Sequence, residues 1–403
     1  MKLQEMLTHW SAAAPNIRTI LTASFLFYGG QFATAYFSLY LSAGVGMSVT
    51  EIGFAVSLFG ASGVIGAWLS DLAIGRLGYM KALVIGQAIS GVILVVLAYL
   101  SDPVLFILVS CVLFVIRALY RPALTVCVNS ECPTDSQNVV YAMFMSISSL
   151  GLAFATAVGG WLLTHHITYI LIAESVFAAL TGFFILAFSR AKSARSDTPG
   201  NVGRKFKVPT GMPELRFLLI CVAAFLLELS TGQTSFAIPI YSVNELGFSP
   251  QTLGIVIAII EILFFVTAVP LNSMFRRVKP LHVAVAATIC VSLGQFLVPF
   301  GDTPLLAVLC RVPYIVGLTL AFPAIVVLAT SGYDADAQLR NTSLFYSAIA
   351  AGELMAGIVG GWIYGSFSGA VLWNFSALAA LICAFLLFFT NSFKSKLVST
   401  EAR

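Results

Sequence analysis

The most informative stretch of this sequence is residues 122–161, which read PALTVCVNSECPTDSQNVVYAMFMSISSLGLAFATAVGGW. Residues 323–362 read PAIVVLATSGYDADAQLRNTSLFYSAIAAGELMAGIVGGW, and an ungapped alignment of the two stretches has 14 identities in 40 positions. The identities include a proline, an aspartate and a terminal Gly-Gly-Trp, which shared apolar composition alone would not match. The sequence therefore repeats itself with an offset of 201 residues, about half of its 403 residues.

The composition places the chain in a membrane. Hydrophobic residues make up 59% of the chain and charged residues only 9%, whereas soluble globular chains carry roughly 25% charged residues. A surface this poor in charge has to face lipid. A helix needs about 20 apolar residues to cross the hydrocarbon layer. We predict twelve such runs: Thr19–Leu41, Ile52–Ile74, Ala82–Leu100, Val104–Cys127, Val139–Leu163, Ile167–Phe188, Phe217–Tyr241, Thr252–Leu271, Leu281–Phe300, Pro304–Ala329, Thr342–Tyr364 and Val371–Phe389.

The repeat offset spans six of these runs, which is an even number. The two halves therefore enter the membrane in the same direction, and an axis along the membrane normal relates them. The sequence predicts an all-α integral membrane fold of twelve transmembrane helices in two parallel six-helix pseudo-repeats. We expect an N-terminal six-helix bundle at residues 1–188, a charged cytoplasmic linker at residues 189–216 and a C-terminal six-helix bundle at residues 217–403.

The basic residues predict the orientation. Outside the runs, every Lys and Arg lies at a terminus or in the loops after runs two, six, eight and ten, and the other loops have none. Because basic residues favour the cytoplasmic side, both termini and the central loop are predicted to be cytoplasmic, in a multi-pass plasma membrane protein. Topology also explains the formal net charge of +4, so we expect no nucleic-acid partner.

The loop between runs two and three carries a family resemblance. Residues 66–71 read GAWLSD, and residues 75–78 read GRLG. This segment resembles the cytoplasmic loop of the major facilitator superfamily, in which an acidic residue at a helix end meets basic residues and a glycine turn. The resemblance, which covers the whole chain, implies that Asp71, Arg76 and Gly78 form a latch between the halves. The alternative is that the loop is a topology signal only.

Other segments bear on the kind of transporter that the resemblance implies. The glycines of residues 151–160 match part of the antiporter signature, but Ala155-Thr156 replaces its Gly-Pro pair. Residues 239–261 resemble bacterial sugar- and drug-efflux members. The first run has no charge, whereas proton-coupled peptide transporters carry a Glu-x-x-Glu-Arg cluster there.

Charged residues inside the runs are the candidates for chemistry. We expect Glu261, Glu228 and Glu353, in that order, to be the proton-coupling residues, because an ionised group at the bilayer centre is costly and usually faces a water-filled cavity or a partner. A carboxyl group whose surroundings alternate between wet and dry can bind and release a proton. The resemblance implies that their helices, together with those of Arg117 and Arg311, line the central cavity. None of these charges falls in the predicted peripheral runs three, six, nine and twelve.

Polar side chains at helical spacing extend this set. One stripe follows the first run and another passes through Glu228 in the seventh, and a polar stripe has to avoid lipid. Hydrogen bonding in a dry helix interface is the alternative, and the glycines beside Glu353 favour close packing there. The predicted substrate-cavity residues are Tyr28, Gln31, Arg117, Arg121, Thr231, Ser235, Arg311 and Tyr314.

These features predict a secondary transporter that moves a small organic compound by alternating access, with proton-coupled efflux as the leading hypothesis. The alternative is a proton symporter or facilitator for uptake of a sugar, a peptide-like metabolite or an organic acid. A receptor on a transporter fold is a third class. The sequence has no phosphate-binding loop and no metal-spaced His/Cys set. We therefore expect no enzyme activity, no cofactor and no metal, and a monomer whose partners are the substrate, protons and lipid.

Overall fold

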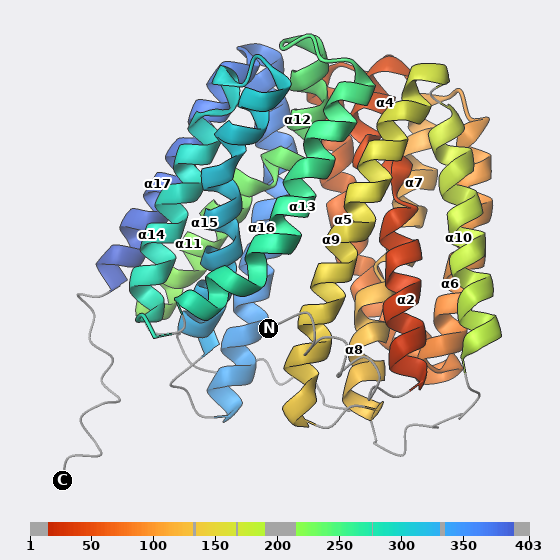
Figure 1. The fold of residues 1–403 in the computed structure, drawn as a ribbon, viewed down its shortest axis with the longest axis horizontal. Helices are drawn as coiled ribbons and strands as arrows, with labels where there is room; N and C mark the ends of the chain where they lie inside the picture. The colour runs from red at the N-terminus through yellow and green to blue at the C-terminus, as the bar shows by residue number, and fades with distance from the viewer. Residues whose placement is uncertain are drawn as a thin grey trace. The chain divides into compact units, whose positions relative to one another are not determined.

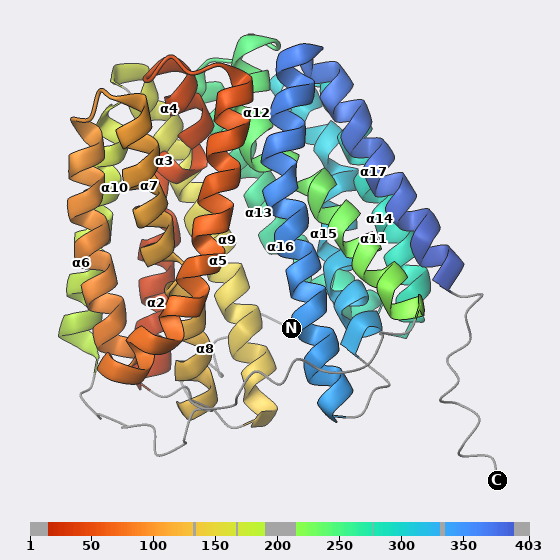
Figure 2. The same cartoon turned by 180° about the vertical axis from the view of Figure 1, so that it is seen from behind.

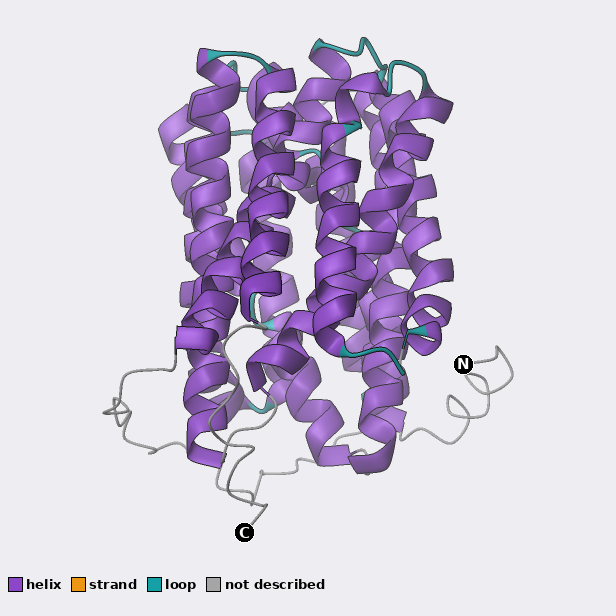
Figure 3. Cartoon of the chain, turned by 90° about the vertical axis from the view of Figure 1, so that its left-hand side faces the viewer, coloured by secondary structure: helices purple, strands orange, loops and turns teal. Residues whose placement is uncertain are grey.

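The computed structural model describes residues 15–131, 134–166, 168–189, 215–275, 277–330 and 335–390. These residues form helices joined by loops, without a strand in the described ranges (Figure 3). The first half contains α2 (Pro15–Gly29), α3 (Phe32–Ala35), α4 (Phe37–Ala43), α5 (Val49–Leu77), α6 (Tyr79–Ala98), α7 (Pro103–Arg117), α8 (Tyr120–Glu131), α9 (Thr134–His165) and α10 (Thr168–Phe188). The second half contains α11 (Leu215–Thr231), α12 (Gln233–Asn244), α13 (Pro250–Met274), α14 (Pro280–Phe296), the 3-10 helix η1 (Val298–Phe300), α15 (Pro304–Thr330), α16 (Ala335–Ser366) and α17 (Gly369–Phe389).

The helices account for the predicted spans. In the described part of the chain, ten helical segments are long and apolar enough to cross a membrane, and α14 is a shorter apolar helix at the ninth span. The first span is divided among α2, α3 and α4. Large apolar side chains are exposed, among them Trp68 at 78% and Phe183 at 68%, as lipid allows and water disfavours. The protein is an all-α, multi-pass membrane protein.

The chain forms two compact units, and both contain segments from each sequence half. The first unit comprises Met1–Met47, Leu58–Arg204 and Ser242–Phe265, and the second comprises Ser48–Ser57, Lys205–Tyr241 and Val266–Arg403. Most of the linker expected at residues 189–216 lies outside the described residues. The division into bundles at that linker therefore stays a prediction.

Aromatic packing dominates the core of the first unit. In this unit α10 packs against α6 and α2, and α2 packs against α9 (Figure 1). Phe27 of α2 stacks on Tyr120 of α8 with ring centroids 4.1 Å apart. Both rings belong to a buried cluster that includes Ile20 and Phe144, so α2 is fixed on several sides.

Close backbone approach is the main feature of the second unit. There α14 packs against α15 and α17, and α11 packs against α16 and α17 (Figure 2). A Cβ on Gly294 would lie 2.7 Å from the Cα of Tyr314, and a Cβ on Gly317 would lie 2.6 Å from the nitrogen of Val291. Glycines on both helices therefore bring the backbones of α14 and α15 together, as is common between membrane helices.

The internal repeat is also visible in a pair of equivalent glycine contacts between helices, here called the glycine seams: Gly53 with Gly361, and Gly254 with Gly160. In the second unit, a Cβ on Gly53 of α5 would lie 2.6 Å from the Cα of Gly361 of α16. In the first unit, a Cβ on Gly254 of α13 would lie 3.1 Å from the Cα of Gly160 of α9. The repeat offset of 201 residues relates Gly53 to Gly254 and Gly160 to Gly361. The repeat therefore preserved a packing contact as well as a sequence pattern.

Candidate transport site

The seventh predicted span is broken at Gly232, between α11 and α12. The N–H of Gly232 donates to the carbonyl oxygen of Glu228 at 2.8 Å, which closes the last turn of α11. A Cβ on Gly232 would lie 2.7 Å from the Cβ of Ala356, and a Cβ on Gly352 would lie 2.9 Å from the Cβ of Glu228. Gly232 at the break and Gly352 on α16 thus allow α11 and α16 to approach closely beside Glu228.

A cavity of about 280 Å³ lies in the second unit beside this break. Five of the predicted site residues share it: Glu228, Thr231, Ser235, Tyr314 and Glu353. The other lining residues are Val56, Gly232, Leu318 and Gly357. The polar stripe predicted on the seventh span therefore lies on the cavity wall.

Two carboxylates give the cavity its electrostatic character. Glu228 of α11 and Glu353 of α16 come from helices that pack together, and both line this cavity. The Thr231 hydroxyl donates to the carbonyl of Leu227 at 3.0 Å, whereas Ser235 is exposed. The wall therefore offers carboxylate oxygens, a hydroxyl and the aromatic ring of Tyr314 to a ligand.

Arg311 lies next to the cavity wall but does not line the cavity. Its side chain is only 4% exposed, and its Cζ lies 3.8 Å from the centroid of the Tyr314 ring. Nη1 donates to Oε1 of Gln295 at 2.9 Å, and Nη2 donates to the hydroxyl of Thr234 at 3.1 Å. Arg311 is therefore not a lining residue of the described cavity, because its guanidinium contacts the Tyr314 ring and two polar side chains. Its assignment to the substrate cavity stays a prediction.

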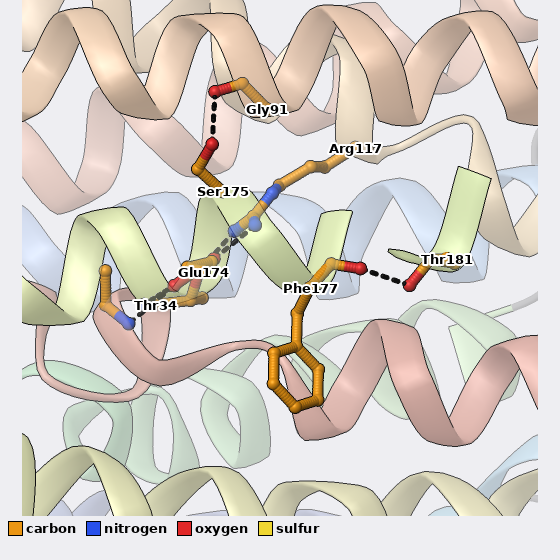
Figure 4. A network of polar contacts seen from close by, with 8 residues as sticks. Thr34, Gly91, Arg117, Glu174, Ser175, Phe177 and Thr181 are labelled. Atoms are coloured by element: carbon orange, nitrogen blue, oxygen red, sulfur yellow. Dashed lines mark hydrogen bonds and ion pairs between the residues drawn. The ribbon is translucent and has the colours of Figure 1, made fainter. Parts of the chain in front are cut away.

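Arg117 has a different environment, at the break of the first span in the first unit (Figure 4). It is ion-paired with Glu174 of α10 and also donates to the hydroxyl of Thr34. The Glu174 carboxylate accepts from the backbone N–H groups of Ala33 and Thr34 and, at 2.9 Å, from the Thr34 hydroxyl. Glu174 is 1% exposed. The pair therefore neutralises itself while it holds the start of α3.

Glu174 is the site residue that the sequence interpretation missed. The prediction placed no membrane charge in the sixth run, yet Glu174 lies inside that run and is buried there. Listing every acidic residue within the twelve runs would have found it. Its pairing with Arg117 across runs four and six is a tertiary contact that no sequence spacing indicates.

The other predicted residues are distributed over several places. Tyr28 lies against the rings of Phe27, Tyr120 and Phe144, and Gln31 precedes α3 without a side-chain capping bond. The alternative of a dry helix interface fits the first-span stripe at Tyr28, because this residue packs against the buried aromatic cluster.

The remaining carboxylate and the latch residues give no common site. Glu261 lies on α13 and is not a lining residue of the described cavity. Arg76 is exposed in the last turn of α5, and Gly78 has a positive φ of 78° at the turn into α6. The side chains of Asp71 and Arg121 lie outside the described residues. The latch and the coupling role of Glu261 therefore stay predictions.

Comparison with known proteins establishes the class. The family model described as Major Facilitator Superfamily matches residues 20–350 and 220–403. The chain belongs to the major facilitator superfamily, and the predicted family and twelve-helix fold are confirmed. It is a secondary transporter.

Solved structures share this fold at low sequence identity. The nucleoside transporter NupG aligns with a TM-score of 0.76 and 15% identity over 94% of this chain and 100% of that one. A D-xylose-proton symporter aligns with a TM-score of 0.70 and 13% identity over 93% and 96%. The peptide transporter POT in complex with sulfate aligns with a TM-score of 0.70 and 17% identity over 95% and 94%. No curated protein sequence matches the chain.

Proposed function

We propose that this protein is a proton-coupled symporter for a small, neutral, hydroxyl-bearing organic compound, and that the cavity beside Gly232 is its binding and coupling site. The observation that carries the proposal is that Glu228 and Glu353 face one cavity of about 280 Å³ together with Ser235 and Tyr314. Carboxylates, a hydroxyl and an aromatic wall in a concave site are typical of small-molecule recognition.

The two carboxylates support proton coupling. Holding two negative charges together in a site of low dielectric is costly. A proton on either group removes that cost, so loading of the cavity can be linked to its protonation state. A conformational change that admits water lowers the cost of ionisation and promotes release of the proton.

The same wall favours some substrates over others. Carboxylate oxygens accept hydrogen bonds from substrate hydroxyl or amine groups, and Tyr314 contributes an aromatic residue to the wall. No cationic side chain is among the lining residues of the described cavity, so an organic acid would meet only repulsion. Ligand cavities usually measure about 300–1,000 Å³, so this one suits a compound of sugar or nucleoside size.

The named structural neighbours suggest which mode of transport and which compounds to test first. They are a nucleoside transporter, a D-xylose-proton symporter and a peptide transporter. At 13–17% identity they share the fold alone, so their substrates serve only to choose test compounds.

Transport in proteoliposomes under a pH gradient tests the proposal. The panel contains uridine, D-xylose, a neutral dipeptide, lactate and tetraphenylphosphonium. We expect uridine or D-xylose to accumulate about tenfold when the outside is acidic, which corresponds to about 1.4 kcal/mol of coupling. Accumulation of lactate alone, or uptake that ignores the pH gradient, would contradict the proposal.

Substitution of the carboxylates tests the assignment of the site. Glu228→Gln and Glu353→Gln keep the size of the side chain but remove proton exchange. Both variants should lose pH-driven accumulation yet still exchange substrate across the membrane. Glu261→Gln is the discriminating third variant: if it alone abolishes coupling, the proton is carried on α13 and not at this cavity.

A second candidate function is proton-coupled antiport with efflux. The partial antiporter signature on α9 favours it, because its glycines lie at close approaches. A Cβ on Gly151 would lie 2.9 Å from the nitrogen of Gly29, and one on Gly160 would lie 3.0 Å from the Cα of Gly254. Accumulation in the same proteoliposomes when the inside, not the outside, is acidic would select antiport.

A further inference from the structure

The break of the seventh span is tied to neighbouring helices by side-chain hydrogen bonds on both sides. Gln233 binds it to α16: its Nε2 donates to the carbonyl oxygens of Leu229 at 3.0 Å and Ala356 at 2.9 Å. Gln295 of α14 binds it on the other side, where Nε2 donates to the carbonyl oxygen of Ser230 at 2.8 Å. The end of α11 is therefore anchored to α16 and α14.

Arg311 completes the second of these anchors. Nη1 donates to the same Gln295 side chain, at Oε1, and Nη2 donates to Thr234 in the first turn of α12. One guanidinium thus reaches the end of α11 through Gln295 and the start of α12 directly. Its face lies on Tyr314, which is part of the cavity wall.

The chemistry of these contacts requires the planar, forked shape of the guanidinium. Among the described residues, no carboxylate forms a salt bridge with Arg311. Its partners are an amide oxygen, a hydroxyl and an aromatic ring, and they lie in different directions. A lysine ammonium is a point charge without the fork or the flat face, so it cannot satisfy the three partners together.

The residues on both sides of the break line the cavity, so a ligand bound there would contact them. Thr231 and Gly232 lie on one side, Ser235 lies just beyond Thr234, and all three line the cavity. A small rotation of α12 relative to α11 would move Ser235 with respect to Glu228. The contacts of Arg311 oppose such a rotation.

We infer that Arg311 is a positioning residue. It fixes α11, α12 and Tyr314 relative to one another at the Gly232 break, and so sets the geometry of the cavity that Glu228 and Glu353 line. This inference rests on the proposed function of that cavity. Arg311 acts through Gln295, Thr234 and Tyr314, and it touches neither the substrate nor the proton-binding carboxylates.

Cysteine accessibility at the cavity wall tests the inference without knowledge of the substrate. Ser235→Cys is introduced into the full-length protein, which is purified in detergent and treated with the water-soluble thiol reagent MTSEA, with labelling of the unsubstituted protein subtracted. Arg311→Met, Arg311→Lys and Thr234→Val are each combined with Ser235→Cys. We expect all three variants to change the labelling rate about threefold or more. Substitutions along a network of contacts typically change the coupling between two sites by an amount of this size.

A matched control separates positioning from loss of a buried polar group. Thr288 is a buried residue on α14, and its hydroxyl donates only to carbonyls of its own helix, at 2.9 Å and 3.0 Å. Thr288→Val should leave the labelling rate of Ser235→Cys unchanged.

The possible results either support or overturn the assignment. If Arg311→Lys keeps the parental labelling rate, the charge matters and not the geometry, and the inference is wrong. It is also wrong if Arg311→Met lowers the thermal midpoint while labelling is unchanged. If Arg311→Met does not fold, Thr234→Val decides, because it removes only the contact to α12. Labelling requires no transport, so a failed flux assay would count against the proposed function and not against this inference.

Discussion

The first and seventh spans break at equivalent positions of the repeat, but different chemistry holds the two breaks. The offset of 201 residues relates Gln31, which precedes α3, to Gly232, which precedes α12. At the first break, Glu174 accepts hydrogen bonds from the start of α3 and is neutralised by Arg117. At the second, Arg311 is buried among uncharged partners. An ion pair holds the first break, whereas hydrogen bonds from a buried cation to uncharged groups hold the second.

The two halves differ in sequence at the residues that hold the breaks. The residues that hold one break have unlike counterparts in the other half: Arg117 corresponds to Leu318, Glu174 to Phe375, Arg311 to Ser110 and Gln295 to Leu94. Leu318 lines the cavity. An arginine at that position would place a cation beside Glu228 and Glu353, whereas leucine leaves the two carboxylates facing the cavity without such a neighbour.

The largest expected effect is the loss of the ion pair at the first break. Arg117→Met leaves Glu174 buried without its cation, and such a loss typically costs about 3–5 kcal/mol. We expect a large drop in folded yield and thermal midpoint. Arg311→Met removes a cation that has no carboxylate partner among the described residues, so it should cost only about 1–3 kcal/mol.

The double variant Arg117→Met/Glu174→Leu provides the control. Replacing both members of a buried pair by apolar residues is often neutral, so it should recover most of the lost stability. Equal losses for Arg117→Met and Arg311→Met would show that the two breaks are held in the same way.

The sequence predicted the periodic features and missed the tertiary pairings, and particular residues show why. The apolar runs predicted the twelve spans, and the repeat predicted two six-helix halves with the same direction, because both features can be read directly from the sequence. The stripe of Glu228, Thr231 and Ser235 was visible as helical spacing and does line the cavity. Arg311 and Tyr314 are three residues apart on the same helix, yet only Tyr314 is a lining residue. Helical spacing predicts which residues share a face of a helix. It does not predict whether that face contacts a cavity or another helix, because this depends on the tertiary structure.

The next largest effect is expected from substitutions that exchange hydrogen-bond donors and acceptors at each break. All the partners of the Glu174 carboxylate are donors, so only a group that accepts on both oxygens fits. Gln295 faces a donor in Arg311 and an acceptor in the Ser230 carbonyl, which only an amide satisfies. Glu174→Gln places an NH₂ group against donors and should cost about 2–3 kcal/mol.

The reciprocal change has opposing contributions. Gln295→Glu loses the bond to Ser230 but gains a charged partner for Arg311, so its cost should be only about 1 kcal/mol. Thermal midpoints of the two isosteric variants, measured in one detergent, compare the breaks directly. A Gln295→Glu variant less stable than Glu174→Gln would contradict the assigned donor and acceptor roles.

The glycine seams should respond alike, because there the two halves have kept the same packing. Gly53→Ala would place a Cβ 2.6 Å from Gly361, and Gly254→Ala would place one 3.1 Å from Gly160 and 2.7 Å from the Tyr36 hydroxyl. Overpacking of this kind typically costs about 1–3 kcal/mol. Ala substitution at Gly63, which has no heavy atom within 4 Å of the added Cβ, is the control and should be tolerated. A loss at only one seam would show that the repeat no longer packs equivalently there.

The smallest effect is expected at a pair of turns that the duplication has left unchanged. Gly46 has a φ of 79° after α4, and its repeat counterpart Gly247 has a φ of 69° after α12. The residue after each glycine donates back across the turn, from Met47 to the Leu41 carbonyl at 3.0 Å and from Phe248 to the Ser242 carbonyl at 2.9 Å. This bond pattern and the left-handed glycine are typical of a helix C-cap. No heavy atom lies within 4 Å of an added Cβ at either glycine, so Gly→Ala adds backbone strain alone, about 1 kcal/mol. Gly46→Ala and Gly247→Ala should therefore lower the thermal midpoint slightly and by equal amounts, and unequal shifts would mean that the halves have diverged at the turns as well as at the breaks.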